Sequence, residues 1–366
     1  MSSYHAADYT DLVTTTLRHL ERGTWAELVV DTQRHIAMPY ILQKKNVTFG
    51  GGYGHQFNVR FFSNNAAQNV KLNQEDNPTT ADTQKTGTIP WRHSETHWAI
   101  EERIISMNSN SAEQLVDLVK TSRTDAWVDL AELMEANFWS GPTSSSDELT
   151  PYGVPVWIVK GSSTTGDFDG GNPTNGAPAT AGGLDTDTYS RWKNWYCQYS
   201  SISKLDLIRK LREALTKTDF RPPIAGPFSN TQYKSVGEGA NYNEGRRNCG
   251  VYTPYAVVSR VEEMLEVQND SLGNDVASKD GMVTIRRIPM SWVPYLDANA
   301  SSTLHGTNPV IGINWDNFKV AFLRGEYMRE SKVKPQPHHH RGVVQYVDCT
   351  YNYFCNDRRS QFLLSQ

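Results

Sequence analysis

Three side chains with metal-binding chemistry lie two residues apart in one extended stretch. His93, Glu95 and His97 would share one face of a strand, because residues two and four apart point the same way. Imidazole and carboxylate groups bind zinc, so this spacing allows a metal-dependent enzyme. A zinc site needs further ligands, and the same pattern is typical of the polar face of an exposed hairpin strand. We favour the polar face and keep the enzyme as an alternative.

The other reactive side chains do not form a catalytic constellation. His338–His340 lie in a Pro-rich segment, which indicates a loop between strands, with metal binding as the alternative. Cys349 and Cys355 can share a strand face, and buried thiols are favoured over ligands. The glycines at 50–54 lack the Lys-Ser/Thr of a phosphate loop. We therefore predict no catalytic residue, no metal and no cofactor.

The segment that carries the first three residues reads as a long hairpin. Residues 57–61 alternate apolar and polar side chains, as a strand with one apolar face does. Residues 73–84 contain no large apolar side chain, and residues 86–100 form a second extended run. A two-stranded ribbon is marginal in water and leaves open hydrogen-bonding edges. We therefore predict that residues 57–105 form an arm that docks on a neighbouring molecule.

Specific residues follow from this interpretation. The predicted inter-subunit contacts are aromatic, aliphatic and basic side chains of the two strands and the tip: Phe57, Val59, Phe61, Lys71, Lys85, Trp91 and Trp98. Directly before the hairpin lies a glycine-rich run with wide backbone freedom. It is predicted to be a hinge that changes the angle of the arm, at Gly50, Gly51, Gly52 and Gly54.

The remaining elements indicate an α+β protein. Residues 111–137 have a capping-box start at Ser111 and one apolar stripe, Leu115, Leu118, Val119, Ser122, Ala126, Leu130 and Leu133, with Glu135 among the acidic residues mostly off it. Residues 152–159 read as a short buried strand and 161–187 as a surface loop. Residues 203–216 read as an amphipathic helix that is capped by Ser203 and faces inward with Leu205, Ile208, Leu211 and Leu215. One more helix is expected near 259–267, and strands at 317–323, 342–348 and 360–364. Helices and strands are segregated rather than alternating, which is typical of the α+β class.

The amino-acid composition favours some classes of protein and excludes others. Aromatic residues make up 11% of the chain, including 10 Trp and 17 Tyr, a level that suits a protein rich in interfaces. The net charge of −4 gives no overall positive field that attracts nucleic acid. If the protein encloses DNA, we expect it to do so without binding the DNA tightly. Four cysteines are too few for a disulfide framework, and no apolar run is long enough for a membrane span.

The order of these parts resembles that of the major capsid proteins of tailed bacteriophages, a fold shared with encapsulins and the floor of herpesvirus capsids. The resemblance extends from about Leu17 to the end of the chain. The segments that carry it, in chain order, are 151–158, 191–194, 266–275, 293–297, 308–315, 347–350 and 356–362. The resemblance implies an N-terminal arm (1–50), an extended hairpin loop (51–107), a peripheral domain (108–150 and 290–345) with its spine helix at 111–137, and an axial domain (151–289 and 346–366).

The resemblance also implies a shell protein and its partners. It implies self-assembly as hexamers and pentamers into an icosahedral head that encloses double-stranded DNA. The expected location is the virion, assembled in the host cytoplasm, with a separate scaffolding protein, a portal and decoration proteins as further partners and no membrane. The alternative from the same fold is an encapsulin-like compartment, and the less favoured one is the enzyme based on His93, Glu95 and His97.

Overall fold

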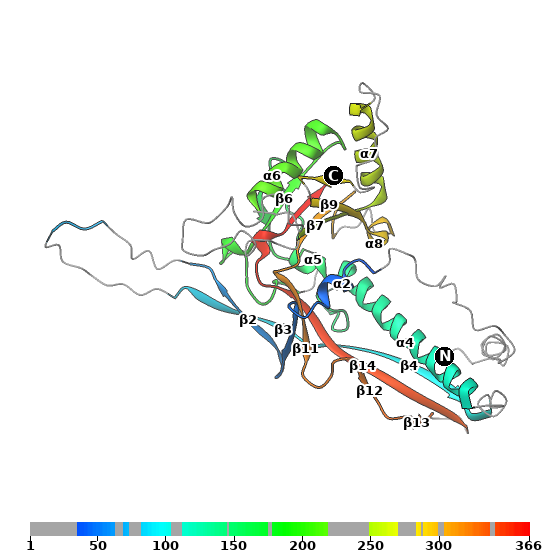
Figure 1. The fold of residues 1–366 in the computed structure, drawn as a ribbon. Helices are drawn as coiled ribbons and strands as arrows, with labels where there is room; N and C mark the ends of the chain where they lie inside the picture. The colour runs from blue at the N-terminus through cyan, green and yellow to red at the C-terminus, as the bar shows by residue number, and fades with distance from the viewer. Residues whose placement is uncertain are drawn as a thin grey trace.

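The computed structural model in Figure 1 shows a hairpin projecting from a body that contains two β-sheets and a long helix. It describes residues 35–62, 69–72, 82–103, 112–144, 146–174, 178–218, 249–269, 283–286, 288–298, 304–336 and 341–366. The predicted N-terminal arm before residue 35, the Ser111 cap and the His338–His340 run lie outside the described residues.

The first sheet has six strands and is built around one long strand, β14 (Gly342–Cys355). Along one edge of β14 lies the antiparallel β4 (Arg92–Glu101). Along its other edge lie, in turn, β11 (Phe318–Leu323), β12 (Arg329–Glu330) and β13 (Lys334–Pro335). The sixth strand, β1 (Val47–Gly50), pairs in parallel with β11. The predicted strand at 342–348 is thus part of a strand twice as long.

The long helix α4 (Ala112–Ser140) packs against β4, as Figure 1 shows. It confirms the helix predicted at 111–137 and ends at Ser140, directly before Gly141, whose φ of 66° suits glycine. Ala126 and Leu130 are buried as expected. Leu133 is 42% exposed, contrary to the predicted stripe, and Met134 is buried in its place. The buried residues Ala126, Leu130, Met134 and Phe138 are each four positions apart. Four residues exceed one turn of 3.6 residues by about 40°, so the buried face rotates along the helix and leaves Leu133 outside it.

The second sheet has seven strands in the order β5-β6-β15-β10-β7-β9-β8. Their bounds are β5 Asp167–Gly170, β6 Asn194–Gln198, β7 Cys249–Thr253, β8 Thr284–Ile285, β9 Ile288–Trp292, β10 Val310–Asn314 and β15 Phe362–Ser365. One face, including Trp195 and Val251, packs with helices α6 (Arg209–Lys217) and α7 (Tyr255–Asn269). The other face, including Tyr196 and Tyr252, joins the larger core shared with α4 and the first sheet.

The short helices complete the body. They are α2 (Met38–Ile41), α5 (Val154–Trp157), α8 (Pro294–Ala298), two 3₁₀ turns at Ser190–Trp192 and Arg358–Ser360, and a π-helical turn at Lys204–Ile208 that leads into α6. Ser203 caps that turn as predicted, by accepting a bond from the Asp206 N–H. Leu205, predicted to face inward, is 81% exposed because the π-helical turn changes the helical phase.

Two predicted elements are different in the structure. The strand predicted at 152–159 is instead helix α5, whose four residues are all buried. A short apolar run cannot be assigned by periodicity alone, and Pro155 near the helix start favours the helix. The predicted surface loop at 161–187 contains strand β5, which pairs with β6.

The predicted hairpin at 57–105 is split by the structure into two parts. Strands β2 (Gly54–Arg60) and β3 (Gln84–Pro90) form the antiparallel hairpin. After Trp91 the chain enters β4, which belongs to the six-stranded sheet rather than to the hairpin. The predicted loop range 51–107 therefore includes a strand of the body. Likewise β10 lies in the seven-stranded sheet, although residues 290–345 were assigned to the other domain. The α+β class itself is confirmed.

Candidate assembly hairpin and its anchors

The base of the hairpin is fixed on its own chain by Phe57. This side chain is 6% exposed, and its ring lies 5.5 Å from that of Phe354 and 6.1 Å from that of Trp157, between centroids. A Cβ atom on Gly182 would lie 2.9 Å from the Phe57 ring, so the glycine makes room for it. The Thr88 N–H also donates to the Gly182 carbonyl at 2.9 Å. The base of the hairpin is thus an integral part of the core.

Further along the hairpin the packing ends. Phe61 is 4% exposed and stacks on Tyr189 at 4.7 Å between centroids. The next described apolar residues are open to solvent: Phe62 is 47% exposed, Val70 61% and Leu72 95%. Exposed apolar side chains on a projecting element are candidates for an interaction surface. The sequence analysis did not select these three residues, although each lies beside one that it did select.

The other predicted contact residues also fall into two groups, those packed within the chain and those exposed to solvent. Trp98 is 9% exposed, and Val59 packs partly buried against the core, so both have partners within the chain. Lys71 is exposed, and Lys85 is partly exposed and forms an ion pair with Asp82, which lowers the pKa of that carboxyl. No neighbouring molecule is present, so an inter-subunit role for the seven residues stays a prediction. The solvent-exposed ones are its best candidates.

The chain turns at the glycine run between β1 and β2. The glycines in this turn differ in backbone φ and in the space that a Cβ atom would have. Gly52 has a φ of 84°, which disfavours other residues, and a Cβ on Gly54 would clash with the Ile89 carbonyl. A Cβ on Gly51 meets nothing within 4 Å. The Trp91 indole N–H donates to the Gly52 carbonyl at 2.8 Å. Trp91 therefore braces the turn, and a hinge here remains a prediction.

The three alternating residues of β4 share the exposed face that the sequence predicts. His93, Glu95 and His97 face solvent, opposite Thr350, Asp348 and Tyr346 of β14. His93 Nδ1 lies 2.8 Å from the Thr350 hydroxyl. Within the described ranges, no three His, Cys, Asp or Glu side chains are grouped as metal ligands would be. Cys349 and Cys355 are buried in β14 as predicted, and burial raises the pKa of their thiols to about 11 and about 12.

A buried carboxylate, Glu135 of α4, holds the start of the described chain. Glu135 belongs to the acidic residues that lie mostly off the predicted apolar stripe, yet it is 0% exposed. Its oxygens accept bonds from the backbone N–H groups of Ile36 (3.1 Å), Ala37 (2.8 Å) and Met38 (2.9 Å), and from the Trp139 indole (2.8 Å). Burial raises the pKa of Glu135, and the N–H donors oppose that rise. The carboxylate thereby ties the segment before α2 to α4.

A second buried charge, Arg358, joins the loops around the seven-stranded sheet. It is 0% exposed and donates to the carbonyls of Trp157 (2.7 Å), Trp192 (2.8 Å) and Gly171 (2.8 Å). Burial lowers the pKa of this guanidinium to about 9. These contacts provide hydrogen-bond partners for a charge that lies inside the protein. An Arg in a short polar segment gives no sign of burial before the fold is known.

The end of α4 is held by a third buried group. His305 is 2% exposed, and its Nε2 lies 3.2 Å from the Trp139 carbonyl oxygen, which requires the proton on Nε2. Burial lowers the pKa of His305 to about 4, so the ring is neutral at pH 7. Glu135 and His305 thus contact the same residue, Trp139, from two distant parts of the chain.

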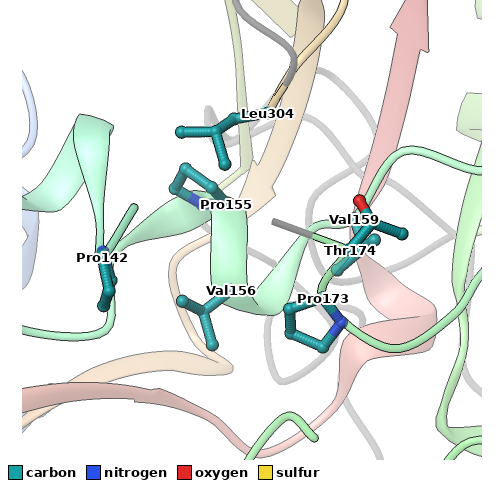
Figure 2. Close-up of a pocket in the computed structure, with 7 residues that line it drawn as sticks. All are labelled: Pro142, Pro155, Val156, Val159, Pro173, Thr174 and Leu304. Carbon is teal, nitrogen blue, oxygen red and sulfur yellow. The ribbon is translucent and has the colours of Figure 1, made fainter. Parts of the chain in front are cut away.

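A small pocket lies beside this junction, between α5 and the loops around it (Figure 2). Its volume is about 10 Å³, room for about one water molecule. The lining is mostly apolar and contains no titratable side chain: Pro142, Pro155, Val156, Val159, Pro173, Thr174 and Leu304. This pocket can hold neither a cofactor nor a substrate of ordinary size. No helix within the described residues has the length and apolar character needed to cross a membrane.

Solved structures resemble the chain over nearly its whole length. The capsid asymmetric unit of cyanophage A-1(L) superposes with a TM-score of 0.53 at 11% identity, covering 95% of each chain. The capsid of an empty GTA particle gives 0.52 at 11% identity, covering 94% of this chain and 98% of the other. The mature capsid of bacteriophage PhiM1 gives 0.52 at 7% identity, covering 95% and 91%. No family model and no curated protein matches the sequence. The likeness is therefore one of fold.

Proposed function

We propose that this chain, which has the fold of tailed-bacteriophage major capsid proteins, is the shell subunit of an icosahedral head that encloses double-stranded DNA. The observation that carries the proposal is coverage: the fold match extends over 95% of both this chain and the cyanophage capsid chain. A match of that extent means that one fold accounts for nearly the whole of the given sequence. The role is structural rather than catalytic, and the location is the virion.

Each part of the fold has its own role in shell assembly. The β2–β3 hairpin is the inter-subunit loop, and the six-stranded sheet with α4 is the peripheral domain. The seven-stranded sheet with α6 and α7 is the axial domain, where copies meet as pentamers and hexamers. Each interface is weak alone, and closed symmetry sums many of them into a stable shell.

The hairpin tip makes the contact that can be tested most directly. Phe62, Val70 and Leu72 are exposed on the free subunit, and burial on a neighbour would remove that apolar area from water. Full burial of one such side chain is worth about 1.5–3 kcal/mol, so three in one contact can drive association. Phe57 packs the base of the hairpin into the core, so the strands near that base lose little freedom on docking.

Purified protein should form closed particles hundreds of ångströms across in negative-stain micrographs, in the void fraction of a sizing column. Changing Phe62, Val70 and Leu72 together to Ser should leave folded subunits that no longer close into shells. Leu149→Ser is the matched control, since Leu149 is 82% exposed but distant from the hairpin in the chain. Normal particles from the triple variant would refute the role of the tip. Absence of particles from the unchanged protein, with portal and scaffolding proteins supplied, would refute the shell function.

An encapsulin-like compartment is the alternative with the same fold. Particle contents distinguish the two, because a phage head holds DNA and a compartment holds a packaged protein. Nuclease-protected DNA in particles purified from the native source supports the head. Particles that contain a single enzyme and no nucleic acid would replace this proposal with the compartment.

A further inference from the structure

The outer surface of helix α6 carries a concentration of positive charge that the whole-chain charge of −4 hides. Residues 204–217 contain five basic and two acidic residues. Arg209, Arg212 and Thr216 lie three and four positions apart, so they share one face of the helix, and all three are exposed. The opposite face, with Leu211 and Leu215, packs into the core beneath the seven-stranded sheet. The basic face therefore points away from the sheet.

A fourth residue extends this face from a distant part of the chain. The Arg286 guanidinium donates to the Thr216 hydroxyl at 2.7 Å, and Arg286 is exposed. Its backbone φ is 52°, in the left-handed region that non-glycine residues rarely adopt. Such strain, held in place by a side-chain contact, is a recognised mark of functional positions. We call Arg209, Arg212, Thr216 and Arg286 the α6 basic stripe.

The acidic residues of this segment do not neutralise the stripe. Asp206 forms its salt bridge with Lys210, at 2.8 Å. Glu213 lies four positions after Arg209 and therefore borders the stripe, but no salt bridge joins the two within the described residues. Among the residues that the structure describes, no carboxylate forms a salt bridge with Arg209, Arg212 or Arg286. Across the described residues no carboxylate neutralises these guanidinium groups, so they can bind an anion from outside the chain.

We propose that the α6 basic stripe binds the phosphate backbone of double-stranded DNA without reading its sequence. The inference rests on the proposed function, because the DNA within a shell is the polyanion that these subunits surround. Arg suits this ligand, since its planar fork binds phosphate oxygens in pairs. From Arg209 to Thr216 the stripe spans about 10 Å at 1.5 Å per residue, and DNA presents one negative charge per roughly 1.7 Å of axis. The stripe can therefore contact more than one phosphate at once.

The test measures binding of a labelled 30-base-pair duplex to unassembled full-length subunits over a series of salt concentrations. Arg209→Gln with Arg212→Gln should weaken binding and reduce the slope of log affinity against log salt by about two, one for each phosphate contact. Arg324→Gln with Lys332→Gln is the charge-matched control. Both residues are exposed, and they lie next to strands of the six-stranded sheet rather than on α6. The control should bind like the unchanged protein, and a second duplex of unrelated sequence should bind equally well.

Equal losses in the two double variants would overturn the inference, because net charge alone would then explain binding. It is also overturned if the stripe variant binds like the unchanged protein, or if no subunit binds the duplex at 50 mM salt. Polyglutamate of matched charge is the competitor. If it displaces the duplex as well as unlabelled DNA does, the stripe is a docking site for an acidic protein instead. Micrographs of the same samples report separately on shell formation, so failure of the stripe and failure of the shell function are distinguishable.

Discussion

The Glu135 carboxylate provides the sharpest test of how the chain before α2 is held. It is fully buried, and four N–H groups, three from the backbone of residues 36–38 and one from Trp139, donate to its two oxygens. We expect Glu135→Gln, which keeps the shape and removes the charge, to destabilise the subunit. The matched control is Asp129→Asn, because Asp129 is exposed on the same helix.

The size of the effect follows from opposing terms. A hydrogen bond to a charged acceptor contributes about 1.5–3 kcal/mol, so four of them set an upper limit of roughly 6–12 kcal/mol. Burial of the charge offsets several kcal/mol of this, in keeping with burial as the main cause that raises the pKa of Glu135. Gln keeps one acceptor oxygen but points an NH₂ group at N–H donors, which leaves buried donors unsatisfied. The net loss in free energy of unfolding should be about 2–4 kcal/mol.

Urea titration of unassembled subunits measures this loss, and hydrogen exchange locates it. The amides of Ile36, Ala37 and Met38 should exchange faster in Glu135→Gln, while those of β14 should change less. Asp129→Asn should stay within about 0.5 kcal/mol of the unchanged protein, as surface substitutions do. If Glu135→Gln is as stable as that control and its exchange is unchanged, the carboxylate does not hold this segment.

The remaining expectations concern three buried or strained positions, His305, Gly52 and Phe57. Burial holds the pKa of His305 at about 4, below its usual 6.5, so stability present above pH 6.5 should be lost as the pH falls toward 4. This loss should total about 3 kcal/mol at 1.36 kcal/mol per pKa unit, and urea titrations of His305→Gln should lack this component. Gly52→Ala should cost about 1–2 kcal/mol because of its left-handed backbone, whereas Gly51→Ala should be neutral by thermal melting, and equal effects would contradict the turn geometry. If the turn is also the proposed hinge, Gly52→Val should keep the shell in its unexpanded form. Normal shell expansion in micrographs of this variant would exclude the hinge. Phe57→Ala should cost about 3–5 kcal/mol by urea titration, and a loss under about 1 kcal/mol would mean that the hairpin base is not part of the core.

Local patterns were sufficient for the elements that carry their own signals. The long helix at α4, the Ser203 cap and the hairpin strand β2 follow from periodicity and capping chemistry, which act over a few residues. The resemblance to capsid proteins came from the order of such elements along the chain. Short apolar runs such as 152–159 failed, because strand and helix bury them equally well.

The partners of those elements could not be predicted from the same patterns. Residues 86–100 look like one extended run, yet the chain leaves the hairpin at Trp91 and pairs β4 with β14, some 250 residues away in sequence. Phe57 and Phe61 looked like contacts for a neighbour because their alternation shows an apolar face without showing what covers it. Their own chain covers them, through Trp157, Tyr189 and Phe354.

The amino-acid order alone predicts the long helix α4, the Ser203 cap and the hairpin strand β2, since these depend on local sterics and periodicity. Burial of Glu135, His305 and Arg358 depends instead on which distant segments meet, as does the gathering of Arg286 with Arg209 on α6. The physical reason is that burial and charge clustering are properties of three-dimensional neighbours. A polar residue becomes an anchor only when packing removes water from it and supplies its hydrogen-bond partners.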